Sequence, residues 1–89
     1  MINTVELIER LKAAYHLPSD YAAAKKLGIT TSAVSKYRCG ISVFGDKTAV
    51  EVAELLDLDP LHVIASMHIE RAQKTHDENA INFWRQYAA

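Results

Sequence analysis

The sequence predicts an all-α fold, a domain of four to five helices with a helical C-terminal extension. Three observations indicate this. Apolar residues recur at intervals of three and four, the spacing of one helix face. Ser, Thr, Asn and Asp stand before these segments, where they cap helices. No segment alternates convincingly as a strand, although residues 41–44 are short and rich in β-forming side chains.

The first two helices are predicted from their caps and composition. Asn3 can cap the first helix and Glu6, three residues on, closes a capping box. Ser19 caps the second, which covers residues 20–27 and is rich in alanine, the best helix former. Gly28 ends it. The apolar face of the first helix comprises Val5, Ile8, Leu11 and Tyr15.

The third helix is capped by Thr30 or Thr31 and ends near Arg38. Gly40 is placed to form a left-handed cap behind it. Residues 41–45 are expected to form a loop. Val34 and Tyr37 are the residues that this helix turns inward.

The remaining helices follow from similar signals. Asp46 opens the fourth helix, and Asp59 caps the fifth with Pro60 at its first position. The fifth helix runs to about Lys74, and Asp77 starts a last one. Their apolar residues are Val50, Ala53, Leu55 and Leu56, then Val63, Ile64, Met67 and Ile69, then Ile81, Phe83, Trp84 and Tyr87.

Composition limits the function classes. The chain has 89 residues, 49% hydrophobic and 24% charged, which is typical of one small globular domain. Its one cysteine, Cys39, excludes an intramolecular disulfide and a multi-cysteine metal site and suits a reducing cytoplasm. The first twelve residues carry charges every few positions, which is unlike a signal peptide or a membrane span. We therefore expect a cytoplasmic protein without a membrane partner.

Charge is unevenly distributed along the chain. Residues 1–47 hold seven basic and four acidic side chains, a balance of +3, whereas residues 48–89 hold three basic and seven acidic, a balance of −4. The whole chain has a formal net charge of −1. The two halves are therefore predicted to face different partners electrostatically.

The stretch AKKLGITTSAVSKYRCG, residues 24–40, predicts a helix-turn-helix unit. Two helices joined by a short turn, often with Gly, form this motif. Gly28 permits a positive φ at the corner, and Ala23 and Ala24 are small enough for close helix crossing. Leu27, Ile29, Val34 and Tyr37 are expected to form the shared core.

The open side of the third helix would then carry short hydroxyl and basic residues. Short side chains let a helix lie deep in the major groove, and hydroxyls hydrogen-bond bases or phosphates. Lys36 can reach a guanine edge, while Arg38 and the N-terminal amides suit phosphate oxygens. We therefore predict binding of double-stranded DNA. The open side comprises Thr31, Ser32, Ser35, Lys36 and Arg38.

The stretch DYAAAKKLGITTSAVSKYRCG resembles the helix-turn-helix of phage repressors of the lambda-repressor/Cro-like family, and DKTAVEVAELLDLDP resembles their fourth helix. The resemblance covers about residues 4–60. It implies a lambda-repressor-like DNA-binding domain at residues 1–60 with a helical extension at 61–89. The tail is similar to those of small phage-encoded regulators.

The resemblance also implies roles for single residues. Thr31, Ser32 and Lys36 fall where family members contact bases, and Thr30 and Ser35 fall at flanking or phosphate-contacting positions. Arg38 and the backbone at residues 39–40 fall where phosphate is held. Relatives often have Gln where Asp20 and Thr31 stand here, and Lys or Arg in place of the uncharged loop 41–44. About four phosphate contacts per subunit would give a log–log salt slope of roughly −3.6.

The C-terminal extension is predicted to form a homodimer. Trp and Tyr are enriched at interfaces, and DNA half-sites one turn apart suit a symmetric dimer. Local packing of the last helix is the alternative. The predicted dimer contacts are Ile64, Met67, Ile81, Phe83, Trp84 and Tyr87.

The predicted function is therefore a sequence-specific transcriptional regulator, a phage or prophage repressor that binds a palindromic operator. Two alternatives stay open: an antitoxin that binds DNA and grips a toxin, and a helical protein-interaction module that binds no DNA. The four histidines lack the i,i+4 pairing of a helical metal site, and no nucleophile elbow is present. We expect no enzyme activity, metal or cofactor, and control through concentration or a regulatory protein partner.

Overall fold

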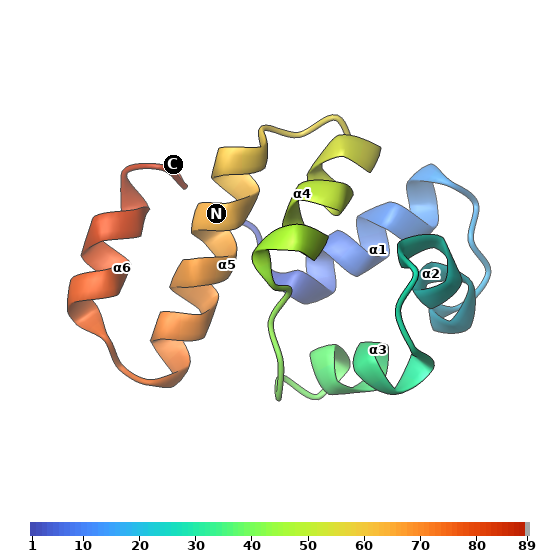
Figure 1. Cartoon of the computed structure of the whole chain (residues 1–89), viewed down its shortest axis with the longest axis horizontal. Coiled ribbons are helices and arrows are strands. Elements are labelled where there is room, and N and C mark those ends of the chain that lie inside the picture. Colours follow the sequence, from blue (N-terminus) through green and yellow to red (C-terminus); the bar gives the residue numbers. More distant parts are fainter. Residues whose placement is uncertain (89) are drawn as a thin grey trace.

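The computed structural model describes residues 1–88, which form an all-α molecule without a strand in that range (Figure 1). Its shape is elongated, with principal extents of 38 × 26 × 18 Å. The helices are α1 (Thr4–Ala14), α2 (Asp20–Leu27), α3 (Thr31–Arg38), α4 (Asp46–Leu55), α5 (Pro60–Lys74) and α6 (Glu78–Arg85). The predicted all-α class is confirmed.

Five of the helices begin at a side-chain cap. In each, a side-chain oxygen accepts a hydrogen bond from a backbone amide two or three residues later, which satisfies one of the amides that a helix start leaves without a partner. Helix α4 differs, because its cap is Gly45. The capping residues are Asn3, Ser19, Thr30, Asp59 and Asp77.

A residue with a left-handed backbone conformation stands just after the end of five helices, α1 to α5. The residue next to this left-handed residue donates its amide to a carbonyl five positions earlier, as Ile29 does to Ala24 at 3.0 Å. This bond satisfies a carbonyl of the last turn and bends the chain sharply. Two of the left-handed residues are glycines, as predicted at Gly28 and Gly40. The full set is His16, Gly28, Gly40, Asp57 and His76.

The main core lies among α1–α4 and one face of α5. Its largest fully buried side chain is Phe44, from the segment that the sequence marked only as a loop. The segment is a loop, as predicted, and the buried Phe44 ring anchors it to the main core. Other core residues are Leu7, Ile8, Leu11, Ala23, Ala24, Leu27, Val34, Ala49, Val52, Ala53, Val63 and Met67.

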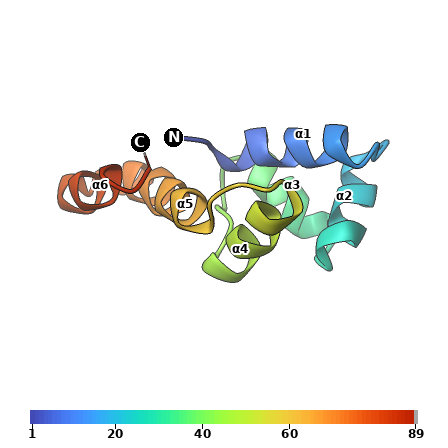
Figure 2. The same ribbon diagram turned by 90° about the horizontal axis from the view of Figure 1, so that it is seen from above.

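A second, smaller core lies between α6 and another face of α5, and Figure 2 shows α5 between α6 and the rest of the molecule. It contains Ala65, Ile69, Ala72, Ile81 and Ala88. Helix α5 therefore contributes to both cores. The N-terminal segment also binds α5, since the Thr4 amide and hydroxyl donate to Glu70 Oε1 at 2.8 and 2.9 Å. The predicted division near residue 60 thus falls at the start of a helix that packs against both parts.

Within residues 1–88, none of the helices combines the length and apolar character needed to cross a bilayer.

Candidate nucleic-acid interface

The corner between α2 and α3 is formed by Gly28, whose φ is +67°. A Cβ added there would meet nothing within 4 Å. Glycine is therefore favoured at this position by its backbone conformation and not by lack of space. Ala23 and Ala24 are almost fully buried at the base of the corner, as their small size predicted.

Helix α3 buries one side and exposes the other. Val34 is buried, and the ring of Tyr37 packs edge-on against Phe44 with 4.7 Å between centroids. The predicted DNA-contacting residues Thr31, Ser32, Ser35 and Lys36 are all exposed on the other side. The structure therefore brings these four together on one solvent-facing surface, which we call the α3 surface.

Thr30 has a structural task at the start of this surface. Its side chain accepts a hydrogen bond from the Ala33 amide at 3.0 Å, which caps α3. The first amides of a helix lack partners inside it. The amides of Thr31 and Ser32 are thus available to an acceptor outside the helix.

Arg38, which we expected to hold a phosphate, is engaged within the chain. Its Nε donates to Asp20 Oδ2 at 3.0 Å and its Nη2 to Asp20 Oδ1 at 2.8 Å. Nη2 also donates to Glu9 Oε1. The side chain is 29% exposed. Arg38 therefore ties the end of α3 to α1 and α2.

The carboxylates of this cluster respond strongly to Arg38. The hydrogen bonds from Arg38, and a further one from Lys12 Nζ at 3.1 Å, lower the pKa of Asp20 to about 2 against the opposing effect of burial. The same guanidinium lowers the pKa of Glu9, and the hydrogen bonds that Arg38 donates to Asp20 and Glu9 raise its own pKa. We call Glu9, Lys12, Asp20 and Arg38 the charge clamp. Asp20 is its central residue, because both Arg38 and Lys12 donate to it.

Other basic residues of the first half make no ion pair with a carboxylate within 4 Å among residues 1–88. Lys26 Nζ lies 4.4 Å from the centre of the Tyr15 ring, and Lys25 Nζ lies 5.7 Å from that of Tyr21, so both rest over aromatic faces. Lys36 belongs to the α3 surface. The positive charge that the sequence assigned to this half therefore remains partly available to a polyanion.

Two basic residues of α5 were missed by the sequence analysis. Arg71 Nη2 donates to the Phe44 carbonyl at 3.0 Å, and Lys74 Nζ donates to the Gly40 carbonyl. They lie three residues apart in the last turns of α5, so they are neighbours on its surface. They hold both ends of the loop that follows α3. Their spacing was visible in the sequence, but the proximity of the loop was not.

Helix α6 and the turn that follows it expose two aromatic side chains. Phe83 is 54% and Tyr87 39% exposed. Trp84 is partly buried, and its ring stacks on that of His68 with 4.3 Å between centroids. His68 Nε2 in turn lies 3.1 Å from Asp46 Oδ1. We call Phe83 and Tyr87, with the edge of Trp84, the α6 surface.

The other predicted dimer contacts lie inside the protomer. Met67 is fully buried in the main core and Ile81 is buried in the second core. Ile64 is partly buried against the main core. The prediction that Met67 and Ile81 contact a second subunit is therefore wrong. Their helical spacing predicted burial correctly but could not say against what.

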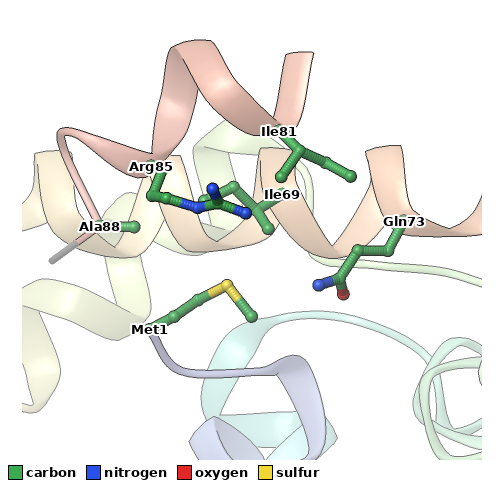
Figure 3. Close-up of a pocket in the computed structure, with 6 residues that line it drawn as sticks. All are labelled: Met1, Ile69, Gln73, Ile81, Arg85 and Ala88. Atoms are coloured by element: carbon green, nitrogen blue, oxygen red, sulfur yellow. The ribbon is translucent and has the colours of Figure 1, made fainter. Parts of the chain in front are cut away.

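A shallow cavity of about 340 Å³ lies between α5, α6 and the N-terminus. Figure 3 shows Met1 opposite Ile69 and Ile81, with Arg85 and Gln73 to either side. Arg85 is the single charged side chain in this lining, so the cavity holds no acid–base pair. Among residues 1–88, no group of three or more His, Cys, Asp or Glu residues is placed to hold a metal ion.

Comparison with known proteins finds a relative in a bacteriophage. The chain is 29% identical over 87 residues to an uncharacterized protein, Gp-c, of Pseudoalteromonas phage PM2, and the match covers 97% of this chain and 95% of that protein. No family model matches the chain. No solved structure matches it.

Proposed function

We propose that this protein is a sequence-specific DNA-binding transcriptional regulator, a phage or prophage repressor that binds a palindromic operator as a homodimer. Helices α2 and α3 would form a helix-turn-helix unit of the lambda-repressor type, with α3 in the major groove. The phage origin of the full-length relative is consistent with a phage-encoded regulator.

The observation that supports this proposal most directly is the α3 surface. Helix α3 buries Val34 and partly buries Tyr37, and the α3 surface carries only short hydroxyl side chains and Lys36. Nothing bulky there keeps the helix axis away from base edges. Thr31, Ser32 and Lys36 are assigned to bases, and Ser35 and the amides at the start of α3 to bases or phosphates.

Selection of bound sequences from a random DNA pool tests the proposal. We expect a palindrome with half-sites centred about 10–10.5 base pairs apart. Replacing Lys36 by Ala should cost about 1–3 kcal/mol of binding and relax base preference at one position of each half-site. Recovery of no enriched sequence, with folded protein, would reject DNA recognition and favour the interaction module.

The α6 surface favours two kinds of protein partner. A second copy of the chain would supply the dimer that a palindrome requires. If the protein is instead an antitoxin, its toxin would bind the exposed rings of Phe83 and Tyr87. Sedimentation of the purified protein gives a dimer in the first case, and a stoichiometric partner co-purified from the native host supports the second.

A further inference from the structure

The C-terminal flank of α3 lacks the cations that a phosphate backbone requires. Arg38, which ends the helix, is held by Asp20 and Glu9. The following loop, residues 41–45, contains no Lys or Arg. Two helix C-termini, those of α3 and α5, also direct partial negative charge to this region. Unless another segment supplies a cation, this flank would repel DNA.

Helix α5 supplies that cation. Lys74 is exposed, and its Nζ donates to the carbonyl of Gly40, two residues beyond the end of α3. Arg71 Nη2 holds the other end of the loop through the Phe44 carbonyl. The contact between Lys74 and Gly40 thus fixes an ammonium group beside the recognition helix.

The Lys74 ammonium has capacity for a further acceptor. An ammonium carries three donors, and the Gly40 carbonyl takes one. Among residues 1–88 no carboxylate lies within 4 Å of Nζ to neutralise it. In Figure 1 the loop after α3 and the turn that follows α5 lie along the same edge of the molecule as α3. A duplex that approaches α3 would therefore meet this corner as well.

We propose that Lys74 binds a DNA backbone phosphate next to the C-terminal end of α3, in place of the loop cations that this chain lacks. The inference rests on the proposed DNA binding. It extends the DNA interface from residues 1–60 into α5. The extension then has a second role besides any partner contact, because it completes the surface that faces the duplex.

Lys74→Gln tests this role. Glutamine keeps an amide donor for the Gly40 carbonyl but removes the charge, so the thermal midpoint should stay close to that of the unmodified protein. We expect weaker binding to operator and to unrelated DNA by the same factor. The slope of log affinity against log salt should become shallower by about 0.9, the value of one phosphate contact.

Arg85→Gln is the matched control, because it removes one exposed positive charge from α6, beside the cavity of Figure 3. Its salt slope should equal that of the unmodified protein. An unchanged slope in Lys74→Gln would overturn the assignment of Lys74, and so would an equal change in both variants. In either case Lys36→Ala must still weaken operator binding if the proposed function holds, so the two failures are distinguishable.

Discussion

Helices α3 and α6 have the same length and similar burial but very different surfaces. Each has eight residues, and each has a single buried residue, Val34 in α3 and Ile81 in α6. Helix α3 exposes short hydroxyl side chains and a lysine, whereas α6 and the turn after it expose Phe83 and Tyr87. How much of a helix is buried therefore does not tell what it binds, and the chemistry of its open side is more informative.

The difference assigns two kinds of partner. Hydroxyl and ammonium groups form hydrogen bonds to a polyanion such as DNA. When no DNA is bound, water satisfies the same groups at little cost in free energy. Large rings gain from removal of water, and Tyr, Trp and Arg dominate the binding energy of protein interfaces. The function proposed above accordingly places nucleic acid on the α3 surface and protein on the α6 surface.

The largest expected effect comes from placing a negative charge on the α3 surface. Ser35→Glu puts a carboxylate against phosphate or base edges, and like charges brought together cost several kcal/mol. We expect operator affinity to fall on the order of 1000-fold in a fluorescence anisotropy titration. Asn79→Glu adds the same charge to exposed α6 and should leave DNA affinity within a few-fold. Equal effects of the two changes would contradict the division of roles.

The next effect concerns the α6 surface. The double change Phe83→Ser and Tyr87→Ser removes both exposed rings, and truncation of each interface anchor costs more than about 1 kcal/mol. The dimer dissociation constant from sedimentation equilibrium should rise on the order of 100-fold or more. Tyr21→Ser, which removes a 60% exposed ring from α2, is the control and should not change assembly.

The corners that lead into the two helices provide a smaller test. Gly28 before α3 and His76 before α6 are both left-handed, with φ of 67° and 55°. A side chain in this conformation costs about 1–2 kcal/mol. Gly28→Ala should therefore lower the free energy of unfolding by about 1 kcal/mol, and His76→Gly should raise it by a similar amount. Gly45 has a φ of −72° and open space around it. Gly45→Ala should therefore not lower the free energy of unfolding through backbone strain or through a steric clash.

Releasing Arg38 from the charge clamp should add a cation to the α3 surface. Asp20→Asn weakens the hold on Arg38 and should cost about 1 kcal/mol of stability, since the carboxylate is about a third exposed and solvent screens it. With Glu9→Gln added, Arg38 is free to bind phosphate. The salt slope of DNA binding should then steepen by about 0.9. A slope that stays the same would show that Arg38 lies out of reach of the duplex even when released.

The smallest effect is in the acid dependence of stability. The pKa of Asp20 is about 2 in the folded chain and 3.8 ordinarily, so between these values the unfolded chain binds more protons. Its contribution is complete above about pH 4 and is lost as pH falls toward 2. Asp20→Asn should flatten this part of a curve of unfolding free energy against pH. An unaltered curve would mean that the clamp does not form in solution.

The sequence predicted the helices well because their signals are local. Asn3, Ser19, Thr30 and Asp59 cap the helices for which they were chosen, and Gly28 and Gly40 adopt the expected left-handed conformation. Capping depends on atoms within five residues, so the chain needs no tertiary information to reveal it.

The failures involve contacts between distant residues. Arg38 and Asp20 are 18 positions apart, and Lys74 and Gly40 are 34 apart. Met67 and Ile81 are apolar at helical spacing in either a core or an interface, so the pattern could not choose between them. The burial of Phe44 in a loop has no periodic signal at all. The exposure of Thr31, Ser32, Ser35 and Lys36 was predicted correctly, because one face of a short helix follows from the burial of the other.

The position of α5 has a consequence for how the molecule comes apart. Since Val63 and Met67 complete one core and Ile69 and Ala72 the other, both cores require the same fifteen residues. Heat should thus melt the chain in one cooperative transition, without a surviving fragment. Recombination between related genes faces the same restriction. A new C-terminal segment that began at residue 60 would have to supply side chains that pack against the first core.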